Sequence, residues 1–287
     1  MVGSDHARSV ARVAVTGQGL GCDVFVAQVR QLSDLAVAEA AASAAAAVAL
    51  ERLGEAVAPE AKDAPTDVVS EVDRAAEAAA VAVIARERPE DGYLGEEGAE
   101  RAAGAATRTW VVDALDGTMN YLLGLQGWCS AVALEDEHGP LAAAICDPVR
   151  GELFTAARNQ GAACNGAPLR IEANDGPATL DEAVIATFLH APKRDLPGVA
   201  ATLQRVLEQV GSVRITGSGT LELAYVAAGR LHGWIQPATF RWDWVPGALL
   251  VTEAGGRAER TTTTSPDWCI AATARLYDEL RKLPGTQ

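Results

Sequence analysis

The chain has 287 residues, enough for one large domain or two ordinary ones with a substantial interior. Hydrophobic residues make up 49% and charged residues 22%, which is the balance of an ordinary globular protein. The 38 acidic residues outnumber the 24 lysines and arginines. This excess argues against a nucleic acid polymer or an anionic membrane as the main partner, and it suits a protein that holds cations.

Cysteine usage and hydropathy indicate a cytoplasmic protein. The five cysteines are scattered and show none of the paired spacings of zinc sites or disulfide frameworks. No stretch approaches the roughly 20 apolar residues that span a bilayer. The N-terminus also lacks the continuous hydrophobic segment of a secretory signal.

The first part of the chain predicts an extension followed by two helices. Residues 1–33 are expected to form an N-terminal extension, because "GQGLGCD" at 17–23 lacks the full spacing of a dinucleotide-binding glycine loop. A long alanine-rich helix is predicted from the N-cap Ser33 to Gly54. A second helix is predicted from Val72 to the residue before Pro89.

The rest of the chain predicts two halves of different class. An apolar run at 110–112 is typical of a buried strand, and short apolar or alternating runs between 129 and 158 are typical of antiparallel strands. We therefore expect residues 34–178 to form an α+β half. Strands alternate with helices in residues 179–287, so this segment is predicted to form an α/β half.

Two carboxylates follow the predicted strand directly. Asp113 and Asp116 flank Leu115, and two such charges about 4 Å apart repel by roughly 4 kcal/mol at an effective dielectric constant near 20. If they converge near the Leu115 carbonyl, the all-oxygen ligand set suits Mg²⁺, Mn²⁺ or Ca²⁺ rather than zinc. Gly117 and Thr118 would then place backbone N–H groups and a hydroxyl beside the metal. The alternative is a strand-end turn with two solvated aspartates.

Two further acidic segments also have two interpretations each. Glu96 and Glu97 lie between two glycines, where adjacent glutamates form either a solvated face or part of a catalytic site. Asp243 lies between two tryptophans at a predicted helix N-terminus. It is either an N-cap or a carboxylate that points into a cleft.

The three acidic segments resemble motifs of the inositol monophosphatase superfamily of Mg²⁺-dependent, Li⁺-sensitive phosphatases, and they follow one another along the chain in the same order. Residues 113–121, "DALDGTMNY", are similar to the family's D-P-[ILV]-D-G-T-x-N-[FY], residues 95–97 to its G-E-E, and residues 242–256 to its W-D motif. The resemblance covers roughly residues 34–283. Three further segments match family motifs in the same order: "DVVSEVD" at 67–73, "ELFTAARNQGAACNG" at 152–166 and "GSGTLELAYVAAGRLHG" at 217–233.

The resemblance implies a fold and a metal centre. The expected fold is a layered αβαβα sandwich of the sugar-phosphatase type, with an antiparallel sheet in the N-terminal half, and the expected assembly is a homodimer. Glu96, Asp113 and the Leu115 carbonyl would hold one Mg²⁺. Asp113, Asp116 and Asp243 would hold a second, and Glu96 would help hold a third. Mn²⁺ would substitute for Mg²⁺.

The resemblance also implies catalytic and substrate-binding residues. Asp67 would hydrogen-bond Thr118, which would align the attacking water near Glu96, and the amides of Gly117 and Thr118 would bind the phosphate. Four further residues are expected to contact the phosphate or the rest of the substrate: Asn120, Gly217, Ser218 and Gln236.

Several positions depart from the family pattern. Ala114 replaces the usual proline. Asn159 stands where glycine is common and is tolerable there if φ is positive, because asparagine adopts that region relatively readily. Gln236 is neutral where inositol-specific relatives commonly place an acidic residue, and it can both donate and accept. Lys193 and Arg194 either meet a second anionic group of the substrate or are ordinary solvated loop charges.

The sequence thus predicts a Mg²⁺-dependent phosphomonoesterase. Its substrate would be a small polyhydroxylated phosphate ester: an inositol phosphate, a sugar phosphate, histidinol phosphate or a nucleotide, either a nucleoside monophosphate or a 3′-phosphoadenosine compound. The alternative is a non-catalytic or regulatory protein that keeps the fold and binds a phosphorylated ligand.

Overall fold

The structure is a computed structural model that describes residues 32–55, 58–62, 68–104, 107–188, 191–261 and 264–285. The predicted N-terminal extension, up to residue 31, and Asp67 lie outside these ranges. None of the helices in the described part of the chain combines the length and the apolar character that a membrane crossing needs.

Two large sheets organise residues 32–285. The first has eight strands in the order β10-β9-β8-β7-β6-β5-β3-β4, and all neighbours are antiparallel except β3 and β5. Its strands are β3 Gly92–Gly95, β4 Glu100–Arg101, β5 Thr109–Asp116, β6 Cys129–Asp136, β7 Gly139–Asp147, β8 Glu152–Ala157, β9 Gly161–Cys164 and β10 Ala167–Leu169. A separate two-stranded ribbon pairs β1 Glu60–Ala61 with β2 Val68–Val69.

The second sheet has five strands in the order β12-β11-β13-β15-β14. The pairs β11–β12 and β11–β13 are parallel, and the other two pairs are antiparallel. Its strands are β11 Val184–Ala186, β12 Ser212–Arg214, β13 Gly233–Pro237, β14 Arg257–Arg260 and β15 Trp268–Ala272.

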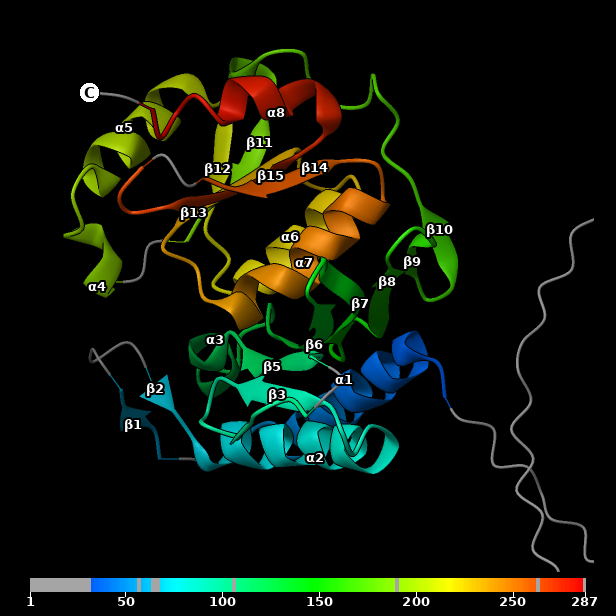
Figure 1. Ribbon diagram of the computed structural model, residues 1–287. Helices are drawn as coiled ribbons and strands as arrows, with labels where there is room; N and C mark the ends of the chain where they lie inside the picture. Colours follow the sequence, from blue (N-terminus) through cyan, green and yellow to red (C-terminus); the bar gives the residue numbers. More distant parts are fainter. Residues whose placement is uncertain are drawn as a thin grey trace, which may run out of the picture. The chain divides into compact units, whose positions relative to one another are not determined.

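Helices separate and cover the two sheets, which gives five layers (Figure 1). Helices α1 Asp34–Glu51 and α2 Glu71–Glu87 pack on one face of the eight-stranded sheet, and α6 Gly219–Ala227 and α7 Arg241–Glu253 fill the space between the sheets. Helices α5 Val199–Gln209 and α8 Ala274–Leu280 cover the other face of the five-stranded sheet. The shorter helices are α3 Thr118–Leu122, α4 Ala191–Arg194 and the 3₁₀ turn Leu180–Glu182. The expected αβαβα sandwich is therefore confirmed.

Local signals explain how α1 and α2 begin. Ser33 is the N-cap of α1, as predicted, and its hydroxyl accepts a hydrogen bond from the Ala36 amide. Ser70 and Asp73 form a reciprocal capping box at the start of α2. The buried face of α1 consists almost entirely of alanine, which lets α2 and the sheet approach closely.

Strand β5 is longer than the sequence predicts. The strand does not end at Val112 but runs to Asp116, and its pairing with β6 shifts between Asp113, opposite Ala131, and Asp116, opposite Cys129. Residues three apart in a regular strand face opposite sides, whereas one extra residue at a bulge brings both to the same side. The bulge therefore allows both aspartates to face the same site.

Helix α7 begins before Asp243, which decides between the two interpretations of that residue. Phe240 is the N-cap, and Asp243 is the third residue of the helix, so the N-cap interpretation of Asp243 is wrong. Because the first turn of a helix has unpaired N–H groups and a positive end, a carboxylate there is favourable without capping.

Candidate active site

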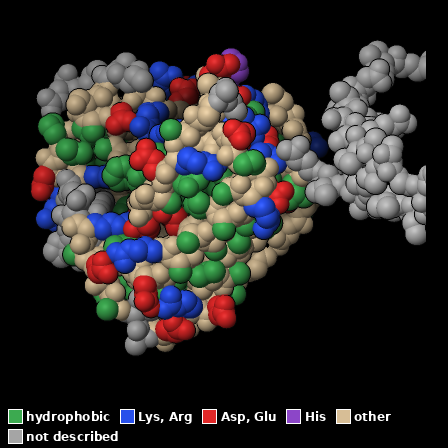
Figure 2. All heavy atoms as spheres, turned by 60° about the horizontal axis from the view of Figure 1, so that its bottom comes forward, with side chains coloured by type: hydrophobic (Ala, Val, Ile, Leu, Met, Phe, Trp, Pro, Cys, Tyr) green, Lys and Arg blue, Asp and Glu red, His purple; other side chains and the backbone are tan. Residues whose placement is uncertain are grey.

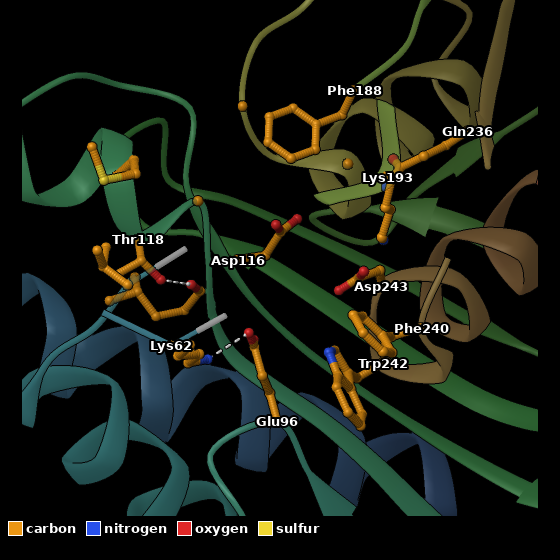
Figure 3. A pocket seen from close by; sticks show the side chains of 16 residues that line it. Lys62, Glu96, Asp116, Thr118, Phe188, Lys193, Gln236, Phe240, Trp242 and Asp243 are labelled. Carbon is orange, nitrogen blue, oxygen red and sulfur yellow. Dashed lines mark hydrogen bonds and ion pairs between the residues drawn. The ribbon is translucent and has the colours of Figure 1, made fainter. Parts of the chain in front are cut away.

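Four carboxylates from three distant segments converge beside one cavity. Asp113 and Asp116 come from β5, Glu96 from the turn after β3, and Asp243 from the first turn of α7. The cavity has a volume of about 300 Å³. Figure 3 shows Glu96, Asp116 and Asp243 directed into it from different elements.

The residues that line this cavity include most of the predicted site. They are Lys62, Val68, Glu96, Leu115, Asp116, Gly117, Thr118, Met119, Phe188, Lys193, Gly217, Gly219, Gln236, Phe240, Trp242 and Asp243. Asp113 is only 1% exposed and does not line the cavity, and its Oδ1 accepts a hydrogen bond of 3.2 Å from the Leu115 amide. Asn120 and Ser218 are not among the lining residues.

The acidic side chains raise one another's pKa. Burial is the largest cause of a strongly raised pKa at Asp113, and the charges of Glu96, Asp116 and Asp243 raise it further. Burial likewise raises the pKa of Asp243, again with help from Glu96 and Asp116. Burial raises the pKa of Asp116 to about 6, although hydrogen bonds from Ser218 and Thr220 oppose the shift. A bound divalent cation would relieve this electrostatic cost.

The chemistry of the donors fits Mg²⁺, because every ligand atom is a carboxylate or carbonyl oxygen. Within the described ranges, however, no three acidic, histidine or cysteine side chains are close enough to hold an ion as they stand. Other partners engage two of the carboxylates. Glu96 forms an ion pair of 3.0 Å with the Lys62 ammonium, and Asp116 Oδ2 accepts from the Ser218 hydroxyl at 2.7 Å and the Thr220 amide at 2.8 Å. Glu96 Oε2 and Asp116 Oδ1 are the oxygens of these two carboxylates that such contacts leave for a cation.

The Thr118 hydroxyl is oriented by residues on two sides. It donates to Asp73 Oδ1 at 2.8 Å and contacts the Leu115 carbonyl at 3.1 Å. The expected partner Asp67 lies outside the described residues, so that contact stays a prediction. Asp73 also belongs to the capping box of α2, so the first turn of that helix fixes the position of Thr118.

Gly117 permits the sharp turn that follows β5. Its φ is 96°, in the left-handed region, and a Cβ atom there would lie 2.9 Å from the Gly127 carbonyl oxygen. Any larger residue would push the turn away from the neighbouring chain. The turn therefore keeps the backbone of residues 117 and 118 at the cavity wall.

Hydrogen bonds tie the loop before α6 to the acidic cluster. Asn120 Nδ2 donates to the carbonyls of Gly127 and Thr216, each at 2.7 Å, so this side chain joins two loops. Ser218 caps α6 while it also donates to Asp116. The side chains of Asn120 and Ser218 thus position the site instead of lining it.

Glu222 is a buried carboxylate that the sequence motifs did not single out. It is 0% exposed, and its Oε1 accepts from both the amide and the hydroxyl of Thr216 at 2.7 Å. Its Oε2 accepts from Trp234 Nε1 at 3.2 Å. Burial raises the pKa of Glu222 to about 7, although the Thr216 hydrogen bonds oppose the shift. A charged residue within the apolar run "TLELAY" is the sequence signal that would have identified it.

The cavity wall also includes a buried amide and three aromatic rings. Gln236 is 3% exposed, and its Oε1 has no hydrogen-bond partner among the described residues. Phe188, Phe240, Trp242 and Lys193 also line the cavity, and the Lys193 ammonium lies 4.7 Å from the centre of the Phe240 ring (Figure 3).

Fold and site together define a class: a layered αβαβα protein of the sugar-phosphatase type with an acidic, oxygen-only site. The chain belongs to the inositol monophosphatase family, whose family model matches residues 31–281. Membership of this family supports a phosphatase that acts on small phosphate esters.

Individual relatives have more than one kind of name. The inositol-1-monophosphatase of Rhizobium meliloti is 39% identical over 193 residues, which cover 67% of this chain and 71% of that protein. The Nus factor SuhB of Pseudomonas aeruginosa is 38% identical over 214 residues, 72% of this chain and 76% of that protein. The solved structure of the extragenic suppressor protein suhB from Bartonella henselae matches with a TM-score of 0.79 at 31% identity, covering 88% of this chain and 98% of that one.

Proposed function

We propose that the protein is a Mg²⁺-dependent phosphomonoesterase that hydrolyses a small polyhydroxylated phosphate ester by direct attack of water. The observation that carries the proposal is the convergence of Glu96, Asp113, Asp116 and Asp243 on one cavity, where burial and mutual repulsion raise the pKa of three of them. A bound cation would neutralise acidic groups that are held together at such a cost.

The metal ligands proposed are those of the family resemblance. Glu96, Asp113 and the Leu115 carbonyl would hold one Mg²⁺, and Asp113, Asp116 and Asp243 a second, with Glu96 helping to hold a third. When bound, Mg²⁺ or Mn²⁺ lowers the pKa of a water molecule and neutralises charge on the ester oxygens.

The chain's own residues orient the reacting groups. The Thr118 hydroxyl, which donates a hydrogen bond to Asp73, would accept a hydrogen bond from the attacking water, and Glu96 lies beside the same cavity. The backbone amides of Gly117 and Thr118 are proposed to bind the phosphate, and Gln236 a hydroxyl of the alcohol part. Phosphoryl transfer depends mainly on such positioning and charge stabilisation.

The partners proposed are a small phosphate ester and a second copy of the chain, in the cytoplasm. On the face shown in Figure 2, acidic and basic side chains are interspersed, and the described residues there form no basic stripe for a nucleic acid polymer to follow. The division into residues 34–178 and 179–287 also remains a prediction.

A panel of esters tests the proposed reaction. Purified protein with Mg²⁺ should release phosphate from at least one of inositol 1-phosphate, a sugar phosphate, histidinol phosphate, a nucleoside monophosphate or a 3′-phosphoadenosine compound. Asp113→Asn should abolish that release. If no ester is hydrolysed with either Mg²⁺ or Mn²⁺, the proposed activity is wrong.

A second candidate is a regulatory protein that binds a phosphorylated ligand without turnover. The observation that favours it is the name Nus factor SuhB, which relatives up to 38% identical carry. Calorimetry separates the two functions, because a regulatory protein would bind the esters of the panel with Mg²⁺ present and release no phosphate.

A further inference from the structure

Helix α2 carries a buried carboxylate that the proposed reaction does not use. Glu77 is 4% exposed, and both of its oxygens accept hydrogen bonds from the backbone of the turn between β3 and β4. Oε2 accepts from the Glu97 amide at 2.7 Å, and Oε1 accepts from the Ala99 amide at 2.9 Å. The same turn carries Glu96, so Glu77 holds the backbone that follows a proposed metal ligand.

The turn is shaped to receive this carboxylate. A Cβ atom at Gly95 would overlap the Glu77 carboxylate, so a glycine at position 95 lets the helix and the turn meet. The Gly95 amide donates to the Ala99 carbonyl at 2.7 Å, which closes the turn. The Glu96 amide donates to the Val112 carbonyl at 3.1 Å, which ties it to β5. Contacts on both sides therefore fix the direction in which the Glu96 side chain leaves the backbone.

Helix α2 supports a second site residue in the same way. Asp73 lies four residues before Glu77, so the two side chains lie on the same face of the helix. Asp73 accepts a hydrogen bond from the Thr118 hydroxyl at 2.8 Å. Thr118 and Glu96 both line the cavity, and the attacking water is proposed to lie between them (Figure 3). One helical turn thus sets the positions of two residues that must act on the same molecule.

A role in folding alone does not account for a carboxylate at this position. Gly98, in the same turn, is exposed, so water could satisfy amides of this turn. Burying a carboxylate also costs more free energy than burying an amide or an apolar side chain. The cost has a reason where the direction of a neighbouring ligand matters, because the residues of a metal site must be held within about 0.5 Å of their working positions.

We propose that Glu77 is a positioning residue for the metal ligand Glu96. By accepting from the amides of Glu97 and Ala99, it fixes the turn from which the Glu96 side chain enters the cavity. Together with Asp73, it makes α2 the common support of the two residues that act on the water. This inference rests on the proposed metal-dependent function, because it concerns the ligand set of that site.

Two substitutions at Glu77 test the inference. In Glu77→Gln the amide NH₂ faces one of the two backbone donors, so one hydrogen bond to the turn is lost. Glu77→Asp keeps the charge but withdraws the carboxylate from the turn, and it also serves if Glu77→Gln does not fold. The Mg²⁺ dissociation constant measured by calorimetry should rise about tenfold in both variants, which is the effect of losing about one hydrogen bond. In the metal-free protein, deuterium exchange of residues 95–101 should become faster by about the same factor.

Glu253→Gln is the matched control. Glu253, at the end of α7, also accepts hydrogen bonds from the amides of a turn in the eight-stranded sheet: Asn159 at 2.8 Å, Gln160 at 3.1 Å and Gly161 at 2.9 Å. It does not line the cavity. Its substitution should speed deuterium exchange of residues 159–161 and leave the Mg²⁺ dissociation constant unchanged.

The outcomes separate the inference from the proposed function. If Glu77→Gln binds Mg²⁺ as tightly as wild type while its turn exchanges faster, Glu77 supports only the fold, and the inference is wrong. If Glu77→Asp binds Mg²⁺ like wild type and Glu77→Gln binds it more weakly, the negative charge alone accounts for the effect, and the inference is again wrong. If wild type neither binds Mg²⁺ nor releases phosphate from the panel of esters, the proposed function itself is wrong, and the inference falls with it.

Discussion

Replacing Glu222 by glutamine should change how the stability of the protein depends on pH. The folded pKa of Glu222 is about 7, against an ordinary value of 4.5. Between these two pH values the folded chain keeps the proton and the unfolded chain releases it, so the free energy of unfolding falls by about 1.4 kcal/mol per pH unit. Glu222 therefore removes about 3 kcal/mol of stability as the pH rises from 4.5 to 7, and the loss is complete above pH 7.

Urea unfolding of the metal-free protein at several pH values from 4.5 to 7.5, followed by tryptophan fluorescence, measures this effect. The difference in unfolding free energy between Glu222→Gln and wild type should move in favour of the variant by about 3 kcal/mol across this range. The unfolding free energy of the variant should also be lower by an amount that does not depend on pH, because the new amide NH₂ would face Trp234 Nε1, which is also a hydrogen-bond donor. Glu208→Gln, on the exposed side of α5, controls for the loss of one negative charge. Parallel pH curves for Glu222→Gln and wild type would show that the buried carboxylate is not protonated in the folded protein.

Three further substitutions test the site itself. Asp113→Asn should raise the melting temperature in EDTA, because burial and the neighbouring charges oppose ionisation of Asp113. It should also remove the rise in melting temperature that Mg²⁺ produces in wild type by ligand linkage. A wild-type melting temperature that changes with neither Mg²⁺ nor EDTA would count against the metal site. Lys62→Met should lower the Mg²⁺ dissociation constant severalfold in calorimetry, because Lys62 no longer competes with Mg²⁺ for Glu96. Lys282→Met, at an exposed ion pair with Glu279, is the control. Equal shifts of the dissociation constant in both variants would point to net charge alone. Asp73→Asn should lower kcat about tenfold with little change in KM, because Thr118 loses its charged partner; an unchanged kcat would exclude Asp73 as the residue that orients Thr118.

Features that depend on neighbouring residues in the sequence were predictable. Ser33 was identified as an N-cap from its position before an alanine-rich run, and the structure confirms it. Asn159 stands where the family pattern has glycine, which asparagine can replace at a positive φ, and its φ is 61°. The resemblance of the acidic motifs, including residues 113–121, to those of a known family implied the fold and the reaction class. Signals of this kind depend on a few adjacent residues, so one sequence suffices to recognise them.

Features that depend on distant contacts were not predictable. The bulge in β5 is defined by its pairing with β6, so Val111 and Val112 alone could not show that the strand continues through Asp116. The ion pair between Lys62 and Glu96 joins residues 34 positions apart, and the hydrogen bond from Ser218 to Asp116 spans 102 positions. Glu222 was overlooked because the reason for its burial lies in Thr216 and Trp234. Such partners come together only when the chain adopts its tertiary fold.

The place of Phe240 has an evolutionary consequence. Its backbone is extended and suits any residue that can start a helix, and its side chain belongs to neither the core nor the cap. Most mutations at buried positions lower stability and are removed by selection, whereas substitutions here change the cavity wall with little effect on folding. Position 240 is therefore a point at which descendants of this chain could acquire new substrates while the carboxylates of the acidic cluster stay unchanged.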